Sequence, residues 1–150
     1  MTDIKSEEER SRNMAAIRGK DTKPEVYLRK LLFAHGYRYR KNVTNIPGHP
    51  DIYLARYNTA VFVNGCFWHR HSGCKYAYTP KSRQDFWITK FENNIKRDQE
   101  VRDLLKEKKI KCLIVWECTI NRMKKSEEAM HCVEDSISEF MIDDSLYKEI

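Results

Sequence analysis

No stretch of the 150-residue chain approaches the roughly 20 consecutive apolar residues that cross a membrane. The first twelve residues are mostly polar and lack the apolar core of a secretory signal. Internal repeats, low-complexity tracts and linker-like stretches are lacking too. We therefore expect one cytoplasmic domain that covers residues 1–150.

Acidic residues are outnumbered, with 22 Asp and Glu against 28 Lys and Arg, which gives a formal net charge of +6. This modest excess suits a polyanionic partner such as nucleic acid. The five cysteines are an odd number at spacings unlike those of a small secreted scaffold, so reduced thiols and metal ligation are expected. Residues 1–20 indicate either a mobile arm that contacts DNA or a frayed terminus.

The first half of the chain predicts a helix followed by three strands. Thr22 and Glu25 are spaced as a capping box, Pro24 suits the first helical turn, and Gly36 ends the apolar periodicity. Glu25 has two roles of equal weight here, a hydrogen bond to the Thr22 backbone or a place in an active site. The predicted elements are a helix over residues 22–35 and strands over residues 37–40, 51–54 and 59–63.

The second half predicts a long helix, a buried strand and a closing helix. Asp98 falls on the apolar face of the long helix, between Trp87 and Phe91 in projection, so it should point inward and find a donor or a metal. Ile95, Val101 and Leu105 are expected on the same face. The strand follows a helical crossover and is therefore expected to run parallel to the strand over residues 59–63. These elements span residues 84–108, 112–116 and 126–141 and complete an α/β fold with a mixed central sheet flanked by helices.

Cysteine and histidine side chains gather directly after two predicted strands. Cys66, His71 and Cys74 lie within nine residues of one another after the first of these strands, and Cys118 follows the second. Parallel strands finish at the same edge of a sheet, so Cys118 is expected beside Cys66. Three thiolates and one imidazole fill a tetrahedral zinc site without an open position, which predicts a structural Zn²⁺.

A second set of side chains suits phosphodiester hydrolysis. If His71 binds zinc, His69 is left free to accept a proton from water, with Asp98 holding its other ring nitrogen. The spacing alone also allows the opposite assignment, with His69 on zinc and His71 free. Asp51, where a loop enters a strand, offers an oxygen ligand for Mg²⁺ or simply caps a turn.

A series of short motifs lies in a fixed order between residues 11 and 118: Arg12-Asn13-Met14, Asp21-Thr22, Pro47-Gly48-His49-Pro50-Asp51, Gly65-Cys66-Phe67-Trp68-His69, Phe86-Trp87, Arg97-Asp98 and Val115-Trp116-Glu117-Cys118. In order and spacing they resemble the very short patch repair (Vsr) DNA mismatch endonucleases. The resemblance implies a restriction-endonuclease-like core and a bacterial, DNA-associated location. It also implies a Mg²⁺-dependent nick on the 5′ side of the mismatched T in a T:G pair, where deaminated 5-methylcytosine lies opposite guanine.

The resemblance also implies roles for individual residues. Asp51 would bind Mg²⁺ together with the backbone carbonyl of Val63. His69 would be the general base, supported by Asp98, and Glu25 would be a further active-site acid. The zinc ligands implied are Cys66, His71, Cys74 and Cys118. We expect a monomer that acts on double-stranded DNA, with the mismatch-repair proteins MutS and MutL as candidate partners.

Three features depart from the expected patterns. Restriction-type nucleases usually carry a Glu-x-Lys pair on the strand after the aspartate, whereas this strand ends Phe62-Val63-Asn64. His69 is interpreted as the replacement for that lysine. The family can carry a histidine where this chain has Asn64, which removes a second imidazole near the phosphate, and Ser72-Gly73 lengthens the zinc loop by one residue.

Phe67 and Trp68 are adjacent aromatics on the predicted zinc loop. Such pairs often plug a core, but beside a basic cleft they can wedge between base pairs and unstack them. The resemblance favours intercalation, with Trp87 as a third aromatic. Arg70, on the same loop, is interpreted as a contact to the phosphate backbone whose loss weakens binding to any duplex.

Two other functions fit parts of this pattern. A zinc-stabilised nucleic-acid-binding module would need the zinc loop and the basic surface but not the convergence of Asp51, His69 and Asp98. A restriction or defence nuclease would cut fully paired DNA, normally as a dimer. Zinc deaminases are disfavoured, since neither the His-x-Glu nor the Pro-Cys-x-x-Cys signature occurs.

Overall fold

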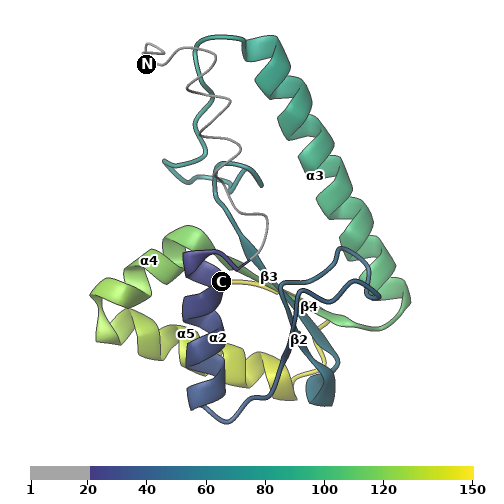
Figure 1. The fold of residues 1–150 in the computed structure, drawn as a ribbon, viewed down its shortest axis with the longest axis vertical. Helices are drawn as coiled ribbons and strands as arrows, with labels where there is room; N and C mark the ends of the chain where they lie inside the picture. The colour runs from purple at the N-terminus through teal and green to yellow at the C-terminus, as the bar shows by residue number, and fades with distance from the viewer. Residues whose placement is uncertain (1–20) are drawn as a thin grey trace.

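The computed structural model describes residues 21–150, which build a five-stranded mixed sheet in the order β1-β2-β3-β4-β5 (Figure 1). The β1/β2 and β2/β3 pairs are antiparallel, whereas β3/β4 and β4/β5 are parallel. The elements are α2 (Lys23–Ala34), β1 (Arg40–Lys41), β2 (Ile52–Leu54), the 3-10 turn η1 (Ala55–Tyr57), β3 (Thr59–Asn64), α3 (Gln84–Glu107), β4 (Lys111–Trp116), α4 (Glu117–Lys125), α5 (Glu127–Ile142) and β5 (Tyr147–Glu149).

Helices cover both faces of the sheet. On one face, apolar side chains of α2, α4 and α5 pack on β2, β3 and β4, with Leu28, Ile120 and Phe140 fully buried. On the other face, Leu105 of α3 packs with Ala60 and with alternate residues of β4. The N-terminal half of α3 extends beyond the sheet, and the segment between β3 and α3 runs beside it (Figure 1). Both layers remove apolar surface from water, and this removal is the dominant favourable contribution to the free energy of folding.

Strand register places the site residues at one edge of the sheet. Asn58 ends the turn between β2 and β3 in the left-handed conformation (φ 48°), which Asn tolerates better than most residues. Antiparallel pairing sets Ile52 opposite Val61, and parallel pairing sets Asn64 beside Trp116. The residues that follow β3 and β4 therefore emerge next to each other.

The expected α/β core is present, including the helix before the hairpin and the parallel β3/β4 crossover. The expected strand over residues 37–40 is wrong at its start, because the Tyr37 N–H bonds to the Leu32 carbonyl and completes the end of α2. Only Arg40–Lys41 pair as β1. Ile95, expected on the apolar face of α3, is 51% exposed, because it projects to the edge of the stripe formed by the buried Trp87, Phe91 and Leu105.

Two elements were not anticipated from the sequence. The helix α4 begins directly at Glu117, between the expected strand and the expected closing helix, and it buries Ile120 and Met123 against α5. The short β5 adds a parallel strand at the far edge of β4.

No helix among residues 21–150 has the length and apolarity to cross a membrane. The expected DNA-contacting arm over residues 1–20 lies outside the described residues.

Candidate active site and metal centre

A cleft of about 860 Å³ opens where β3 ends, between α2 and α3. Its walls include the carboxylates of Glu25, Asp51, Asp98 and Glu117 and the imidazoles of His49 and His69. Asp51 precedes β2, His69 lies on the segment after β3, and Asp98 comes from α3. Glu25, from the first turn of α2, also lines the cleft. The structure therefore brings together the four side chains that the sequence singled out for chemistry.

Asp51 is half-buried in this cleft. Its carboxylate accepts a hydrogen bond from the backbone N–H of Val63 at 2.8 Å. Burial, and to a smaller extent the nearby Glu25 carboxylate, raise the pKa of Asp51 to about 7, while the Val63 N–H opposes the shift. A half-buried carboxyl near a second carboxylate is a favourable place for a divalent cation, because the cation would stabilise both charges.

This environment makes folding stability depend on pH. The native Asp51 keeps its proton up to about pH 7, whereas an unfolded Asp loses it near pH 3.8. The native state thus binds more protons between these values, and stability falls as the pH rises through that window. We predict that Asp51→Asn, which keeps an acceptor for Val63, is about 1–3 kcal/mol more stable than the parent at pH 8 without Mg²⁺.

At pH 4 the two proteins should unfold at nearly the same temperature, because Asp51 is then neutral. Thermal melts of both proteins from pH 4 to pH 8 measure the difference. A difference that stays constant across this range would show that the ionisation of Asp51 does not destabilise the fold.

Glu25 is 4% exposed and binds two donors. Its Oε2 accepts from the Asp21 backbone N–H at 2.8 Å and from Arg29 Nη2 at 3.1 Å. Thr22 caps the helix as expected, accepting from the Glu25 N–H at 3.4 Å. The return bond was expected at the Thr22 backbone and instead goes to Asp21, one residue earlier. Glu25 therefore serves the cap and also lines the cleft, so the two roles weighed from the sequence are compatible.

Arg29 is a buried partner that the sequence interpretation missed. It is 5% exposed and also donates to Asp21 Oδ1 at 2.7 Å, and this bond lowers the pKa of Asp21. Asn42 donates to the same oxygen at 3.2 Å, while its backbone N–H bonds to the carbonyl of Asp51 at 3.0 Å. This network ties the start of α2 to the residue that enters β2. The i,i+4 spacing of Glu25 and Arg29 was the available signal.

His69 and Asp98 form a close pair. His69 Nδ1 lies 2.7 Å from Asp98 Oδ2, and both side chains are about one-third exposed. If the Nδ1–H donates to the carboxylate, Nε2 is left as a proton acceptor. Asp98 thus finds the donor expected for it, although it is half-buried and lies at the cleft rather than in the core.

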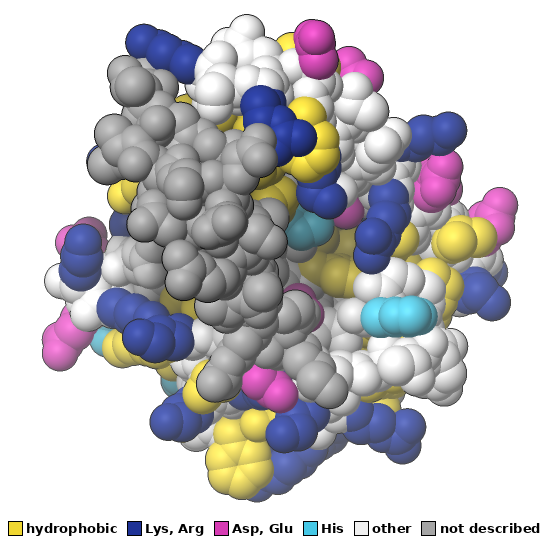
Figure 2. All heavy atoms as spheres, turned by 45° about the horizontal axis from the view of Figure 1, so that its top comes forward, with side chains coloured by type: hydrophobic (Ala, Val, Ile, Leu, Met, Phe, Trp, Pro, Cys, Tyr) yellow, Lys and Arg dark blue, Asp and Glu magenta, His cyan; other side chains and the backbone are white. Residues whose placement is uncertain are grey.

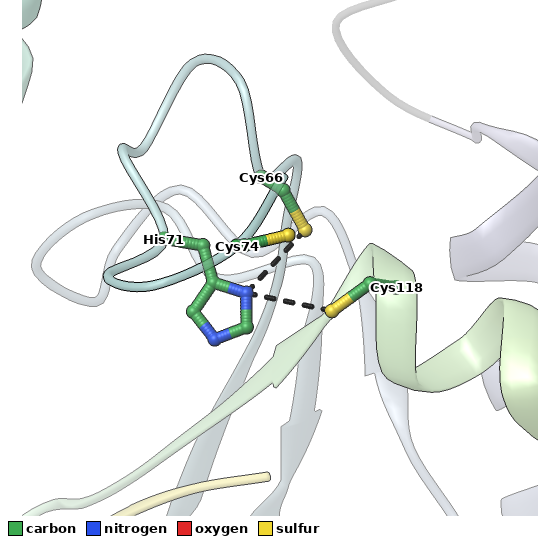
Figure 3. A group of neighbouring side chains, drawn as sticks. All are labelled: Cys66, His71, Cys74 and Cys118. Atoms are coloured by element: carbon green, nitrogen blue, oxygen red, sulfur yellow. Dashed lines mark hydrogen bonds between the residues drawn. The ribbon is translucent and has the colours of Figure 1, made fainter. Parts of the chain in front are cut away.

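Cys66, His71, Cys74 and Cys118 place three sulfurs and one ring nitrogen within 4.8 Å of one another. Figure 3 shows Cys118, from the first turn of α4, facing the three side chains of the loop after β3. His71 Nδ1 is 3.6 Å from Cys66 Sγ and 3.4 Å from Cys118 Sγ. A tetrahedral zinc ion with ordinary bond lengths separates such ligand atoms by about 3.6 Å. The cluster therefore has the atoms and spacing to hold a metal, and it selects His71 over His69.

The surroundings of the cluster affect the orientation and the protonation of its side chains. The His71 ring stacks on Trp116 with a centroid distance of 4.1 Å and an interplanar angle of 5°. Trp116 Nε1 donates to Glu149 of β5 at 3.0 Å, which fixes the indole. Burial lowers the pKa of His71, which favours the neutral imidazole that metals bind. Burial raises the pKa of the Cys66 thiol to about 12, so a bound cation would be needed to keep it as a thiolate.

Phe67 is the centre of an aromatic cluster beside the cleft. Its ring contacts those of Trp68, Tyr78, Trp87 and Phe91 at centroid distances of 5.1–5.5 Å. Trp87 is 8% exposed, whereas Phe67 and Trp68 are half-buried. As described, Trp87 therefore packs with Phe67 and Trp68, and its insertion into DNA stays a prediction.

The backbone of Trp68 is fixed by α3, because Asn94 Nδ2 donates to its carbonyl at 3.0 Å. Arg70 does not extend as a free cation, contrary to its interpretation as a phosphate contact. Its guanidinium donates to loop carbonyls and lies 3.8 Å from the Phe91 ring centroid. The role of Arg70 as a phosphate contact stays a prediction, because a sequence does not show which arginines are taken up by main-chain acceptors.

Other cationic side chains lie on α3. Lys90, Arg97 and Arg102 line the cleft, and the first two are exposed. Figure 2 shows Lys and Arg side chains spread over the described part of one face, with hydrophobic side chains between them. Positive charge around a cleft attracts phosphates in a salt-dependent way.

Comparisons with known proteins find relatives that are nicking enzymes and mismatch endonucleases. The sequence model of the family "DNA mismatch endonuclease Vsr" matches residues 2–75. Type II nicking enzyme V.NmeAIP of Neisseria meningitidis is 44% identical over 131 residues, covering 87% of this chain and 93% of that protein. Type II nicking enzyme V.XorIIP of Xanthomonas oryzae is 38% identical over 135 residues, covering 90% and 98%. DNA mismatch endonuclease Vsr of Escherichia coli is 37% identical over 131 residues, covering 87% and 83%.

Proposed function

Because this chain belongs to the Vsr family of DNA mismatch endonucleases, we propose that it nicks one strand of duplex DNA at a T:G mismatch. The nick would fall on the 5′ side of the mismatched T and depend on Mg²⁺. The observation that carries the proposal is the convergence of Asp51, Glu25 and the His69–Asp98 pair in one cleft that Trp68 also lines. A binding module without catalysis would not require this convergence.

Asp51 is the residue best placed to hold Mg²⁺. The other ligands we propose are the Glu25 carboxylate and the backbone carbonyl of Val63. Glu25 lies in the same cleft and acts electrostatically on Asp51. Such a donor set fits Mg²⁺, which binds one or two carboxylates and keeps room for water and phosphate oxygens. Mg²⁺ bound there would polarise the scissile phosphate and lower the pKa of a bound water. Ionised Asp51 is needed for this binding, so Mg²⁺ affinity should fall as the pH drops below about 7.

His69 is the proposed general base. Its Nδ1 is engaged by Asp98, so Nε2 would take the proton from the attacking water. Asp98 holds the ring in one orientation and stabilises the imidazolium after the proton has moved. Glu25, held by Arg29 and the Asp21 N–H, keeps a fixed carboxylate in the same cleft.

The mismatch would be selected by unstacking. Phe67 and Trp68 are the residues we propose to enter the base stack, with Trp87 behind them. Opening a mismatched step costs less than opening a paired one, and stacking on an aromatic ring offsets about 1–3 kcal/mol per base. A wedge of this kind therefore prefers T:G over fully paired DNA.

Trp68→Ala is predicted to weaken binding to a T:G duplex by about tenfold or more while changing binding to the matched T:A duplex by less than about threefold. The loss follows from the missing stacking surface at the mismatched step. Fluorescence anisotropy at fixed ionic strength measures both affinities. Tyr76→Ala is the matched control, since Tyr76 is an exposed aromatic of the same loop. Equal losses on both duplexes would assign Trp68 to packing alone.

The proposed activity is tested directly with a T:G duplex labelled on either strand. Mg²⁺ should support nicking of the T-containing strand, and the G-containing strand should stay intact. Binding without nicking in the presence of Mg²⁺ would favour the zinc-stabilised binding module. Light scattering and pull-down assays test separately whether the protein is a monomer and whether it binds MutS or MutL.

A further inference from the structure

Arg70 joins three parts of the chain through one guanidinium. Nη1 donates to the carbonyls of Phe67 at 3.1 Å and Tyr78 at 2.9 Å. Nη2 donates to the carbonyl of Ala77 at 2.8 Å and to Thr79 Oγ1 at 3.3 Å. These bonds connect the start of the zinc loop to residues 77–79, which are distant along the loop. A planar fork with several donors can satisfy such a set, whereas a point charge cannot do so in the same geometry.

The same guanidinium also lies over an aromatic ring of α3. The guanidinium carbon is 3.8 Å from the Phe91 ring centroid, and Phe91 contacts Phe67 and Trp87. Arg70 thus lies against the aromatic cluster centred on Phe67 and connects it to the helix. In Figure 1 the segment between β3 and α3 runs beside this half of α3.

The backbone of Arg70 is also unusual. Its φ of 54° lies in the left-handed region, where residues other than Gly, Asn and Asp are uncommon. The residues on either side are His69, which pairs with Asp98, and His71, which faces Cys66 and Cys118. Arg70 therefore lies, along the chain, between the imidazole of the cleft and the imidazole of the metal cluster.

We propose that Arg70 is a positioning residue for mismatch recognition: its guanidinium holds residues 67–79 as one rigid unit, so that Phe67 and Trp68 meet the DNA in a fixed geometry. This proposal rests on the proposed function, because it gives Arg70 a part in the recognition that precedes nicking. Holding the loop before DNA arrives lowers the ordering cost of binding. Because its donors are used within the protein, Arg70 makes little direct contribution to phosphate binding.

Two variants distinguish the effect of the planar guanidinium from the effects of its positive charge and of the left-handed backbone at position 70. Arg70→Asn tolerates the left-handed conformation but removes the clamp. Arg70→Lys keeps the positive charge without the planar fork. Arg97→Ala, on the exposed cleft wall of α3, is the control for an ordinary phosphate contact. The zinc content of each variant is measured first.

The experiment measures affinity for T:G and matched duplexes across a range of salt concentrations. Both Arg70 variants should lose about tenfold or more of the preference for T:G, and the slope of log Kd against log salt should remain that of the parent. Arg97→Ala should lower this slope by about one and keep the preference. A slope lowered by about one in Arg70→Asn, with the preference intact, would make Arg70 a phosphate contact and overturn the proposal.

A readout without DNA keeps the proposal independent of the nicking activity. Limited trypsin digestion of the free protein at Lys75 and Lys81 should be about tenfold faster in Arg70→Asn than in the parent, because the loop opens more often. The same rate in both proteins would overturn the clamp. If the parent protein nicks no T:G duplex, the proposed function fails, and the digestion result still decides whether Arg70 orders the loop.

Discussion

Replacing His69 by alanine is expected to lower the rate of T:G nicking by about 10²–10⁴-fold, which is the usual contribution of a general base. The loss should fall on the chemical step, since the His69 ring lines the cleft with Asp98 and does not belong to the metal cluster. DNA affinity and zinc content should stay close to those of the parent. Single-turnover nicking with saturating enzyme separates the chemical step from binding.

Asp98→Asn is the matched variant, because it keeps the size of the side chain and removes the charge that stabilises the imidazolium. It should lose less activity than His69→Ala and shift the pH dependence of nicking. His71→Ala should behave differently and lose zinc together with the fold. If His69→Ala nicked at the parental rate, or released zinc, the roles given to the two imidazoles would be reversed.

Removing zinc is expected to unfold most of the domain. Structural zinc sites contribute apparent binding free energies on the order of 10 kcal/mol, comparable to the whole stability of a domain of this size. The cluster joins the loop after β3 to the first turn of α4, so its loss would also release the loop that carries His69 and Trp68. Circular dichroism and metal analysis during titration with a strong chelator measure both effects.

Cys118→Ser should behave like chelation, because it removes one of the four ligand atoms. Cys132→Ser is the matched control, since Cys132 is exposed and lies outside the cluster. A purified protein without zinc, whose stability does not change with chelator, would contradict the structural role of the site.

Much of the fold follows from local signals. The capping residues of α2, the β-branched run of β3 and the helical crossover to β4 each predict an element that is present. The two elements that were missed, α4 and β5, are short. The helix α4 begins without a break after β4, and β5 depends on pairing with Ile114 and its neighbours, which no local pattern of three residues reveals.

The residues that converge in the candidate site were named from the sequence, but the contacts between them were not. Spacing from Cys66 allowed either His69 or His71 to bind zinc, and only the fold shows that Nδ1 of His71 faces Cys118. The roles of Arg29 and Arg70 depend on backbone groups and carboxylates brought together by loops and helix starts. Such contacts follow from tertiary packing, whereas sequence patterns report mainly the nature of an element and the face it buries.

The central claim is that the Asp51 and His69–Asp98 cleft makes a mismatch-dependent nick. It is tested most directly by mapping the cleavage product of a duplex with one T:G pair, in Mg²⁺, beside the same duplex with T:A. We expect one nick on the 5′ side of the mismatched T, none in the T:A duplex, and none with Asp51→Asn. Double-strand cleavage of the T:A duplex, or a nick that persists in Asp51→Asn, would contradict it.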